Sequence, residues 1–529
     1  TIRVALPGDR VFLPHDDLLP KVVSLAGRGG AGEVVWEERS IRNSYNVPVL
    51  VGGKLYAYSS RAFGCVDSET GELLWRSADP GDGFLSAVDG HLVMLTKRGT
   101  LHLAEASTDD YRELASVELF ADPSWCVPAV VGNSIFVRSN GEIARVDIVP
   151  GESVPLLAQE EMPLGADFAA FLEAAAAAPN RQAFVERYLA GQKEFPIIEG
   201  DIVHFVLSGD HHNAAVASDL FGARQERTMV RLADTDFFYY SARIPTDTRA
   251  GYIFVTDFSA SGPDPRNQRR VKSNYLVEDM EMVFLTNGET LVFSYFDMPD
   301  HVPTFDPTGE EELRGAMVEG ELESEAMGET IAYRIYTPPG YSEEGAAFPV
   351  VFVHDAEAAQ DYGHLPRIVD ELIATRAIRP VVVAFIRRAY NPMVGAMGYE
   401  QMFSEELIAR IERDFNLSSD REDRASLGGG FGGFLSLTGG LSASAQIGKI
   451  GAHSPYAFAM MLPMVSGAME AADPKPSVRL DYGTFDLANP DENWDMGAGT
   501  VRIGNLLEDG GIPAVVVSFN DGTDWLSWR

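Results

Sequence analysis

The stretch from Arg424 to Gly433, R-A-S-L-G-G-G-F-G-G, constrains the fold of this chain more than any other part of the sequence. An apolar run leads into closely spaced glycines, and a helical pattern, F-G-G-F-L-S-L, follows at once. Glycine is needed where a chain turns so sharply that side chains would clash. The pattern therefore predicts a strand that ends in a tight turn and opens directly into a helix.

The residues around this turn are typical of a parallel sheet covered on both faces. Short, fully apolar runs alternate with helical stretches, as crossover connections between parallel strands require. Sites in such sheets lie beyond the carboxyl ends of the strands, which is where the glycine turn falls. The runs are 348–353, 380–386, 424–428, 477–482 and 513–519, and the helical stretches include 366–376, 402–414 and 501–508.

Residues 1–158 repeat with a period of about forty residues, which predicts the blades of a β-propeller. G-E-V-V-W at 32–36 recurs as G-E-L-L-W at 71–75, and three glycine-containing turns each precede an alternating strand pattern. The segment C-V-D-S-E-T-G-E-L-L-W-R-S resembles the blades of quinoprotein-like propellers. We expect three to four blades, an incomplete ring, so a partner protein or self-association through the propeller is one expected interaction.

The middle of the chain divides into three further segments. Alanine-rich patterns at 159–194 predict a helical connector, and alternating patterns over 195–302 predict an immunoglobulin-like (Ig-like) β-sandwich. Residues 303–318 form an acidic linker before the last domain, 319–529. His204, His211 and His212 have no acidic residue at a fitted spacing, so we expect no metal site, and nothing indicates another cofactor.

The net charge of −36 repels phosphate backbones and argues against nucleic-acid binding. No apolar run reaches the 18 or so residues that a membrane helix needs, so we expect no membrane span.

Several ordered motifs over 166–529 resemble the enterochelin (siderophore trilactone) esterase family. They include T-D-F-F-Y-Y-S-A-R-I-P and G-P-D-P-R-N in the predicted sandwich, then Y-R-I-Y-T-P-P-G-Y, F-P-V-V-F-V-H-D and R-P-V-V-V-A-F-I. The resemblance implies an Ig-like sandwich followed by an α/β-hydrolase domain with a mostly parallel sheet. The fold class predicted for the whole chain is therefore multidomain: a partial all-β propeller, a sandwich and an α/β-hydrolase.

The resemblance also implies the place of each catalytic group, and two of these places are empty. In the family's G-x-S-x-G turn the nucleophilic serine would stand at Gly430. The histidine of the family's Gly-His-x-Trp motif would stand at Thr523, and a threonine hydroxyl cannot accept a proton near neutral pH. Asp486, in G-T-F-D, is the candidate acid, with a structural turn residue as the alternative. No G-x-S-x-G occurs elsewhere in the chain.

Other parts of a hydrolytic site are retained in the pattern. The backbone of Phe431 follows the empty slot, and Ala356 lies where the family places its second oxyanion donor. His354 and Trp525 are candidates for the cleft, although a core position is the competing interpretation for His354.

These patterns predict a pseudoenzyme: an extracellular or periplasmic binding or scaffold protein that holds a small-molecule ester or carboxylate without cleaving it. One alternative is an active carboxylic-ester hydrolase that uses other residues. Another is a structural subunit of an oligomer or filament, completed through the propeller.

Overall fold

The computed structural model divides the chain into two compact units, residues 1–161 with 490–493, and residues 162–489 with 494–529. Within the described residues, no helix is both long and apolar enough to cross a bilayer. The model describes all residues except 1–3, 7–9, 14–20, 25–32, 38–45, 60–61, 149–161, 223–224, 258–259, 274–290, 303–311, 355, 388–397, 457–460, 490–493, 524 and 526–529.

The first unit is all-β and contains four consecutive antiparallel sheets in its described residues. Each sheet is built from strands that follow one another in the chain, which is the order that the repeat predicts. Their strands are β1 (Val4–Leu6), β2 (Arg10–Leu13), β3 (Lys21–Ser24) and β4 (Glu33–Glu37); β5 (Val49–Val51), β6 (Lys54–Ser59), β7 (Ala62–Asp67) and β8 (Leu73–Ser77); β9 (Gly83–Val88), β10 (His91–Thr96), β11 (Thr100–Glu105) and β12 (Arg112–Glu118); and β13 (Ala129–Val131), β14 (Ser134–Arg138) and β15 (Ile143–Asp147).

Apolar clusters join each of these sheets to the next. Phe12 and Trp36 of the first sheet pack with Leu55 of the second, and Trp75 of the second packs with Met94 of the third. A further cluster joins the third sheet to the fourth, whose outer side exposes Ile143. The all-β character of this region agrees with the sequence, and its identity as a propeller stays a prediction.

The second unit begins with two helices, α1 (Ala166–Ala177) and α2 (Arg181–Gly191). Their buried residues share one apolar cluster with Val206 and Phe237, so the helices cover one face of the sheet that follows. His204, on that sheet, is fully buried, stacks on Phe168 at 4.1 Å between ring centroids, and contacts Ser241 Oγ through Nδ1 at 2.7 Å. Burial lowers the pKa of His204 to about 4, so this histidine is a neutral core residue at pH 7.

Two sheets form the predicted sandwich region and share an apolar cluster that includes Phe205, Val216, Phe254 and Phe296. The immunoglobulin-like topology stays a prediction, and one of its alternating segments, M-E-M-V-F-L at 280–285, lies outside the described residues. One sheet contains β16 (Ile197–Glu199), β17 (Ile202–Ser208), β20 (Val230–Arg231) and β21 (Phe237–Arg243); the other contains β18 (Ala214–Ala217), β19 (Arg227–Thr228), β22 (Arg249–Thr256), β23 (Ala260–Gly262), β24 (Arg270–Ser273) and β25 (Leu291–Asp297).

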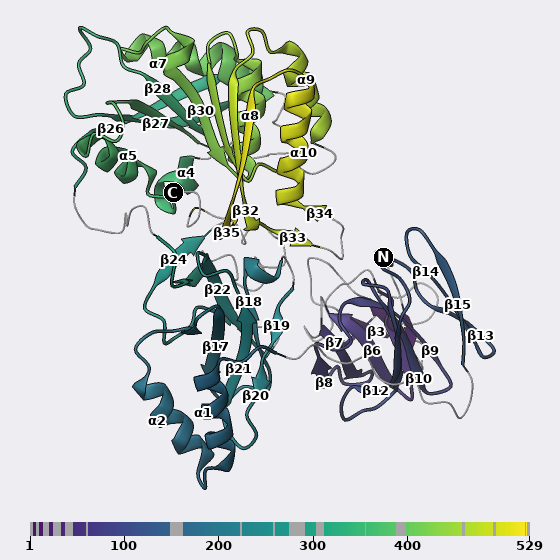
Figure 1. Cartoon of the computed structure of the whole chain (residues 1–529). Coiled ribbons are helices and arrows are strands. Elements are labelled where there is room, and N and C mark those ends of the chain that lie inside the picture. Colours follow the sequence, from purple (N-terminus) through teal and green to yellow (C-terminus); the bar gives the residue numbers. More distant parts are fainter. Residues whose placement is uncertain are drawn as a thin grey trace. The chain divides into compact units, whose positions relative to one another are not determined.

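The second of these sheets continues into the sheet of the last domain, because β22 pairs with β35 at Arg249 and Asp521. From that point the strand order is β35-β32-β31-β30-β28-β29-β27-β26, and β28 to β32 and β35 run parallel (Figure 1). The strands are β26 (Ala316–Ser324), β27 (Glu329–Thr337), β28 (Val350–His354), β29 (Val382–Ile386), β30 (Arg424–Gly429), β31 (Lys449–His453), β32 (Ser477–Phe485) and β35 (Ala514–Gly522). All five predicted apolar runs are strands.

Helices cover both faces of this sheet. The largest apolar cluster of the chain joins one face to the helices α7, α8, α9 and α10, and a second cluster joins the other face to α4 and α5 (Figure 1). This three-layer arrangement is the α/β fold that the alternating pattern predicts. The helices are α4 (Ala356–Asp361), α5 (Leu365–Ala374), η2 (Met402–Leu407) with α7 (Ile408–Asp414), α8 (Phe431–Ser442), α9 (Leu462–Ala471) and α10 (Met496–Asp509).

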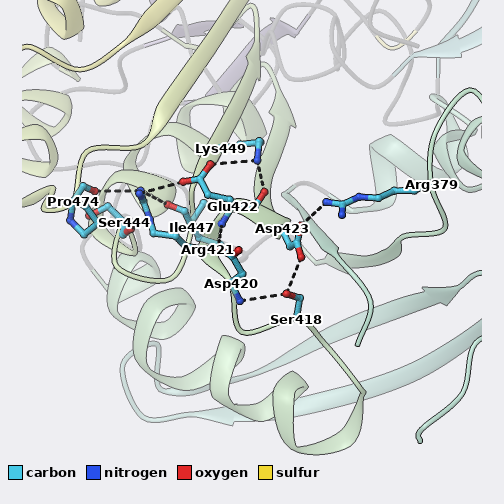
Figure 2. A network of polar contacts seen from close by, with 10 residues as sticks. All are labelled: Arg379, Ser418, Asp420, Arg421, Glu422, Asp423, Ser444, Ile447, Lys449 and Pro474. Atoms are coloured by element: carbon cyan, nitrogen blue, oxygen red, sulfur yellow. Dashed lines mark hydrogen bonds and ion pairs between the residues drawn. The ribbon is translucent and has the colours of Figure 1, made fainter. Parts of the chain in front are cut away.

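A polar network fixes the start of β30, at the opposite end from the glycine turn (Figure 2). Arg421 donates to the backbone oxygens of Ser444, Ile447 and Pro474, at 3.0 to 3.3 Å. Asp423 accepts from Arg379 at 2.5 Å, and this contact is the main reason why its pKa is lowered. The network ties the loop before β30 to neighbouring loops and holds the strand that carries the turn.

Candidate active site

The glycine turn has the geometry of a strand-to-helix elbow. Strand β30 ends at Gly429, α8 begins at Phe431, and Gly430 between them has φ 56° and ψ −119°. Residues with a side chain seldom adopt this conformation, and in hydrolases it presents the nucleophile at the top of the sheet. The amide of Gly430 donates to the oxygen of His453 at 2.9 Å, and its oxygen accepts from the amides of Phe434 and Tyr456 at 3.1 Å each.

Close backbone packing enforces this elbow. A Cβ at Gly428 would lie far inside 3.0 Å of Gly432 O, and one at Gly433 would lie 2.9 Å from His453 O. Because backbone atoms cannot swing aside as a flexible side chain can, glycine is required at both positions. The elbow is therefore complete except for the serine side chain at Gly430.

The candidate acid and the empty base position are directly joined. Thr523 Oγ1 donates to Asp486 Oδ1 at 2.8 Å and accepts from the amide of Leu487 at 2.8 Å. Ser454 Oγ donates to the same carboxylate oxygen at 3.0 Å. The predicted pair of Asp486 and Thr523 thus comes together, with a threonine hydroxyl making the contact that a histidine N–H would make in a catalytic triad.

Asp486 is almost inaccessible to solvent, at 6% exposure, and its Oδ2 atom has no hydrogen-bond partner among the residues that the structure describes. Burial raises the pKa of Asp486 to about 7, and the hydrogen bonds from Ser454 and Thr523 act in the opposite direction. In a triad a histidine cation would keep this carboxyl ionised. Among the described residues no such cation contacts Asp486, so nothing there offsets the effect of burial on its pKa.

The sandwich region also contributes to this end of the site. Asp219, in the 3-10 turn Asp219–Phe221, accepts from the amide of Thr523 at 2.9 Å. A Cβ at Gly522 would lie 2.5 Å from the same Asp219 oxygen. The backbone at the base position is therefore fixed by a carboxylate about 300 residues away in sequence, and no sequence pattern indicated this.

The two predicted oxyanion donors come from neighbouring strand ends. Phe431 is the first residue of α8, after β30, and Ala356 is the first residue of α4, after β28. The two strands are adjacent and parallel, with Val353 paired to Leu427. Both amides therefore belong to helix starts at the same edge of the sheet, where amide groups and helix dipoles favour negative charge.

The two cleft candidates are buried. His354 has no exposed surface; its Nδ1 contacts Tyr399 Oη at 2.6 Å and its Nε2 contacts Ser426 Oγ at 2.8 Å. Burial lowers the pKa of His354 to about 3, so it is a neutral core residue beneath α8, as the competing interpretation holds. Trp525 is 4% exposed and packs against Gly363.

A second imidazole–carboxylate pair lies beside the elbow. His453 ends β31, pairs in register with Gly429, and contacts Asp481 Oδ1 through Nδ1 at 2.6 Å. Its side chain is 23% exposed. Because a carboxylate only accepts, Nδ1 carries the hydrogen, and Nε2 is left as the acceptor. The sequence gave no signal that Asp481 would face His453 from the neighbouring strand β32.

A metal site is not evident in the described part of the chain, which contains no suitable group of three His, Cys, Asp or Glu side chains.

Residues 324–495 match the family model described as "Putative esterase". This region is therefore similar to that esterase family, and the unit that contains it has an α/β-hydrolase fold like that of an enterochelin esterase. Ferric enterobactin esterase from Salmonella typhimurium superposes with a TM-score of 0.52 at 16% identity, over 65% of this chain and 95% of that one. Enterobactin esterase from Shigella flexneri, determined with 2,3-dihydroxy-N-benzoyl-glycine, gives 0.50 at 16% identity over the same shares of the two chains.

An uncharacterised Bacillus subtilis protein, YbbA, is 27% identical over 141 residues. The match covers 23% of this chain and about half of that protein (55%). The family resemblance predicted from the sequence is thus confirmed for the α/β-hydrolase fold.

Proposed function

We propose that the hydrolase domain is a pseudoesterase, which binds a small ester or carboxylate at the former active site without hydrolysing it. The contact between Thr523 and Asp486 carries this proposal. In this contact the Asp486 carboxyl accepts from a threonine hydroxyl, which cannot act as a general base, and Gly430 provides no nucleophile.

Retention of the elbow supports binding rather than loss of the whole site. The start of α8 directs backbone amides and the positive end of the helix dipole toward the turn, which favours a carbonyl or carboxylate oxygen. The similarity to enterobactin esterases makes 2,3-dihydroxybenzoyl-amino acids the first ligands to test.

Two measurements test the proposal. Incubation with p-nitrophenyl esters and with a catecholate trilactone is expected to release no more product than the heat-denatured protein does. Calorimetric titration with 2,3-dihydroxybenzoyl-serine is expected to show binding that Phe431→Pro, which removes one backbone donor, weakens about tenfold. Steady turnover, or no binding of any ester or carboxylate tested, contradicts the proposal.

The double variant Gly430→Ser with Thr523→His tests whether the scaffold still supports catalysis. A serine at the elbow and a histidine against Asp486 would restore the triad in place, so measurable ester hydrolysis is expected. The single variant Gly430→Ser is the control, because it lacks the base and should remain at least 10² slower.

A second candidate function, slow hydrolysis by water, is favoured by the pair of His453 and Asp481. In this mechanism the His453 Nε2 atom takes a proton from a water molecule, and the resulting hydroxide attacks the ester carbonyl. Collapse of the tetrahedral intermediate expels the alkoxide, and the alkoxide takes from the His453 imidazolium the proton that the water gave up. This function requires turnover in the wild-type protein that His453→Gln lowers about 10²-fold, whereas the exposed His91→Gln leaves it unchanged.

A further inference from the structure

Strand β35 forms an incompletely paired edge of the large sheet. On one side it pairs with β32 continuously from Ala514 to Phe519. On the other side β22 reaches it only at Asp521. Among the described strands, none covers residues 514–519 on that side. Over these residues β35 is therefore open on one side, whereas β27 to β32 of the same sheet are each paired on both sides among the described residues.

The direction of the backbone groups on this edge follows from the ladder with β32. Val478 N donates to Pro513 O at 2.8 Å, and in a parallel pair alternate residues bond to the same neighbour. The residues 515, 517 and 519 therefore point their amide and carbonyl groups to β32. Ala514, Val516 and Ser518 point theirs to the open edge, which offers donors and acceptors to another strand.

The side chains of this edge carry no charge. The sequence A-V-V-V-S-F is rich in residues that favour strands, and Val515 is 57% exposed. Val516 lies on the other face, close to Gly504 of α10. Such an exposed, uncharged edge strand is what natural proteins avoid unless another strand covers it.

The strand at the far end of the hydrolase part of this sheet, β26, is protected. Strand β26 carries glutamates at 319, 321 and 323, which alternate and so share one face. Two copies of this strand side by side would bring like charges together, which is destabilising. The hydrolase strands are therefore bounded differently on their two sides: β26 carries a row of carboxylates, and β35 carries none over residues 514–519.

We propose that β35 pairs antiparallel with β35 of a second copy of this chain, across a twofold axis. A chain with net charge −36 repels its own copies, so contact is favoured where carboxylates are absent. Antiparallel pairing of a strand with itself satisfies the outward groups of both copies and closes the assembly as a dimer. Such a dimer joins the two large sheets into one.

Light scattering after gel filtration of the full chain, from about 1 to 100 μM, tests this proposal. The wild-type protein is expected to have twice the monomer mass at the upper concentrations. Val515→Lys places two cations in the interface, and Ser518→Pro removes an outward amide without breaking the ladder with β32. Both variants are expected to be monomers with an unchanged circular dichroism spectrum.

Val318→Lys, at a valine on β26 that is 43% exposed, is the matched control and should remain dimeric. A monomeric wild-type protein overturns the proposal, and so does a dimer that persists in a folded Val515→Lys variant. Loss of the dimer on Ile143→Lys, at an 81% exposed residue of the first unit, together with its survival in Val515→Lys, would assign self-association to the predicted propeller instead.

Discussion

The glycine elbow and the acid pocket around Asp486 differ in how they hold the position where the family resemblance would place a catalytic group. At the elbow the serine side chain is absent, but the backbone keeps φ 56° and ψ −119° at Gly430. At the acid pocket the histidine position is occupied by Thr523, whose hydroxyl bonds to both Asp486 and Leu487. The first position carries no side chain, whereas the side chain at the second is bound into the pocket on both sides.

The difference has a physical cause. The elbow is held by backbone packing around Gly428 and Gly433, so its shape does not depend on a side chain at position 430. The acid pocket is held by side chains, and a buried carboxyl without a donor would cost about 1–3 kcal/mol. A hydroxyl at position 523 removes much of that cost. A nucleophile at the elbow therefore needs only a serine side chain at position 430. A histidine base at position 523 must displace the existing hydrogen bonds of Thr523 to Asp486 and Leu487.

The largest effect is expected from Gly428→Val at the elbow. Its Cβ would overlap backbone atoms of Gly432 and Gly433, which cannot move without breaking the start of α8. We expect a loss of at least about 3 kcal/mol in the free energy of unfolding. Urea denaturation of the second unit, with hydrogen exchange of the α8 amides, measures it.

Gly467→Ala is the matched control for that variant. Gly467 lies in α9, and no atom lies within 4 Å of the Cβ that alanine would add. Alanine should stabilise this helix by about 0.5–1 kcal/mol. If Gly428→Val is as stable as the control, backbone packing does not hold the elbow.

The elbow could be predicted from the sequence, but most of the pocket around Asp486 could not. A run of glycines between an apolar strand and a helix is a local signal, and backbone constraints of this kind can be read from residue order. Asp219, Ser454 and Asp481 reach their partners from other strands and from the sandwich, so their roles depend on tertiary register. The sequence showed that a threonine stands where the family motif has a histidine, whereas the contact of Thr523 with Asp486 is seen only in the structure.

The fold, too, could be predicted from the sequence only in part. The five apolar runs became strands because a buried parallel strand needs a continuous apolar sequence. Two other features of the sheet were not predicted: strand β31, which carries His453, and the pairing of β22 with β35, which joins the sandwich sheet to the hydrolase sheet. Neither β31 nor the joining of the two sheets has a distinctive local sequence pattern. His204 on β17 shows the same limit for a candidate that the structure removes. Its place in the core follows from the packing of Phe168, on helix α1, against its ring.

The next effect in size concerns the pH dependence of stability, which Asp486→Asn should change. The pKa of Asp486 is raised to about 7 from an ordinary value near 3.8, so the folded state holds a proton that the unfolded state releases. The contribution of this residue is complete below pH 4 and is lost as pH rises through 7. Three units would amount to about 4 kcal/mol at most.

Asparagine is neutral at every pH and keeps one oxygen to accept from Ser454 and Thr523. The stability of the wild-type protein relative to Asp486→Asn is therefore expected to fall by about 2–4 kcal/mol between pH 4 and pH 8. Urea titrations at several pH values measure this difference, in which other titrating groups largely cancel. A constant difference would show that the pocket keeps Asp486 ionised.

The smallest effect is expected from Thr523→Val, which keeps the shape of the side chain and removes its hydroxyl. The amide of Leu487 then loses its acceptor, and Asp486 loses one of two hydroxyl donors, so we expect a loss of about 1–2 kcal/mol. Thr523→Ser retains the hydroxyl and should cost less than about 1 kcal/mol. Because the hydrogen bond from Thr523 lowers the pKa of Asp486, valine should also raise that pKa further, whereas serine should not. Infrared titration of the Asp486 carboxyl in Thr523→Val and Thr523→Ser measures this difference in pKa. If the two variants have the same stability and the same pKa of Asp486, the hydroxyl of Thr523 does not stabilise the carboxyl, and the side chain at position 523 only fills space.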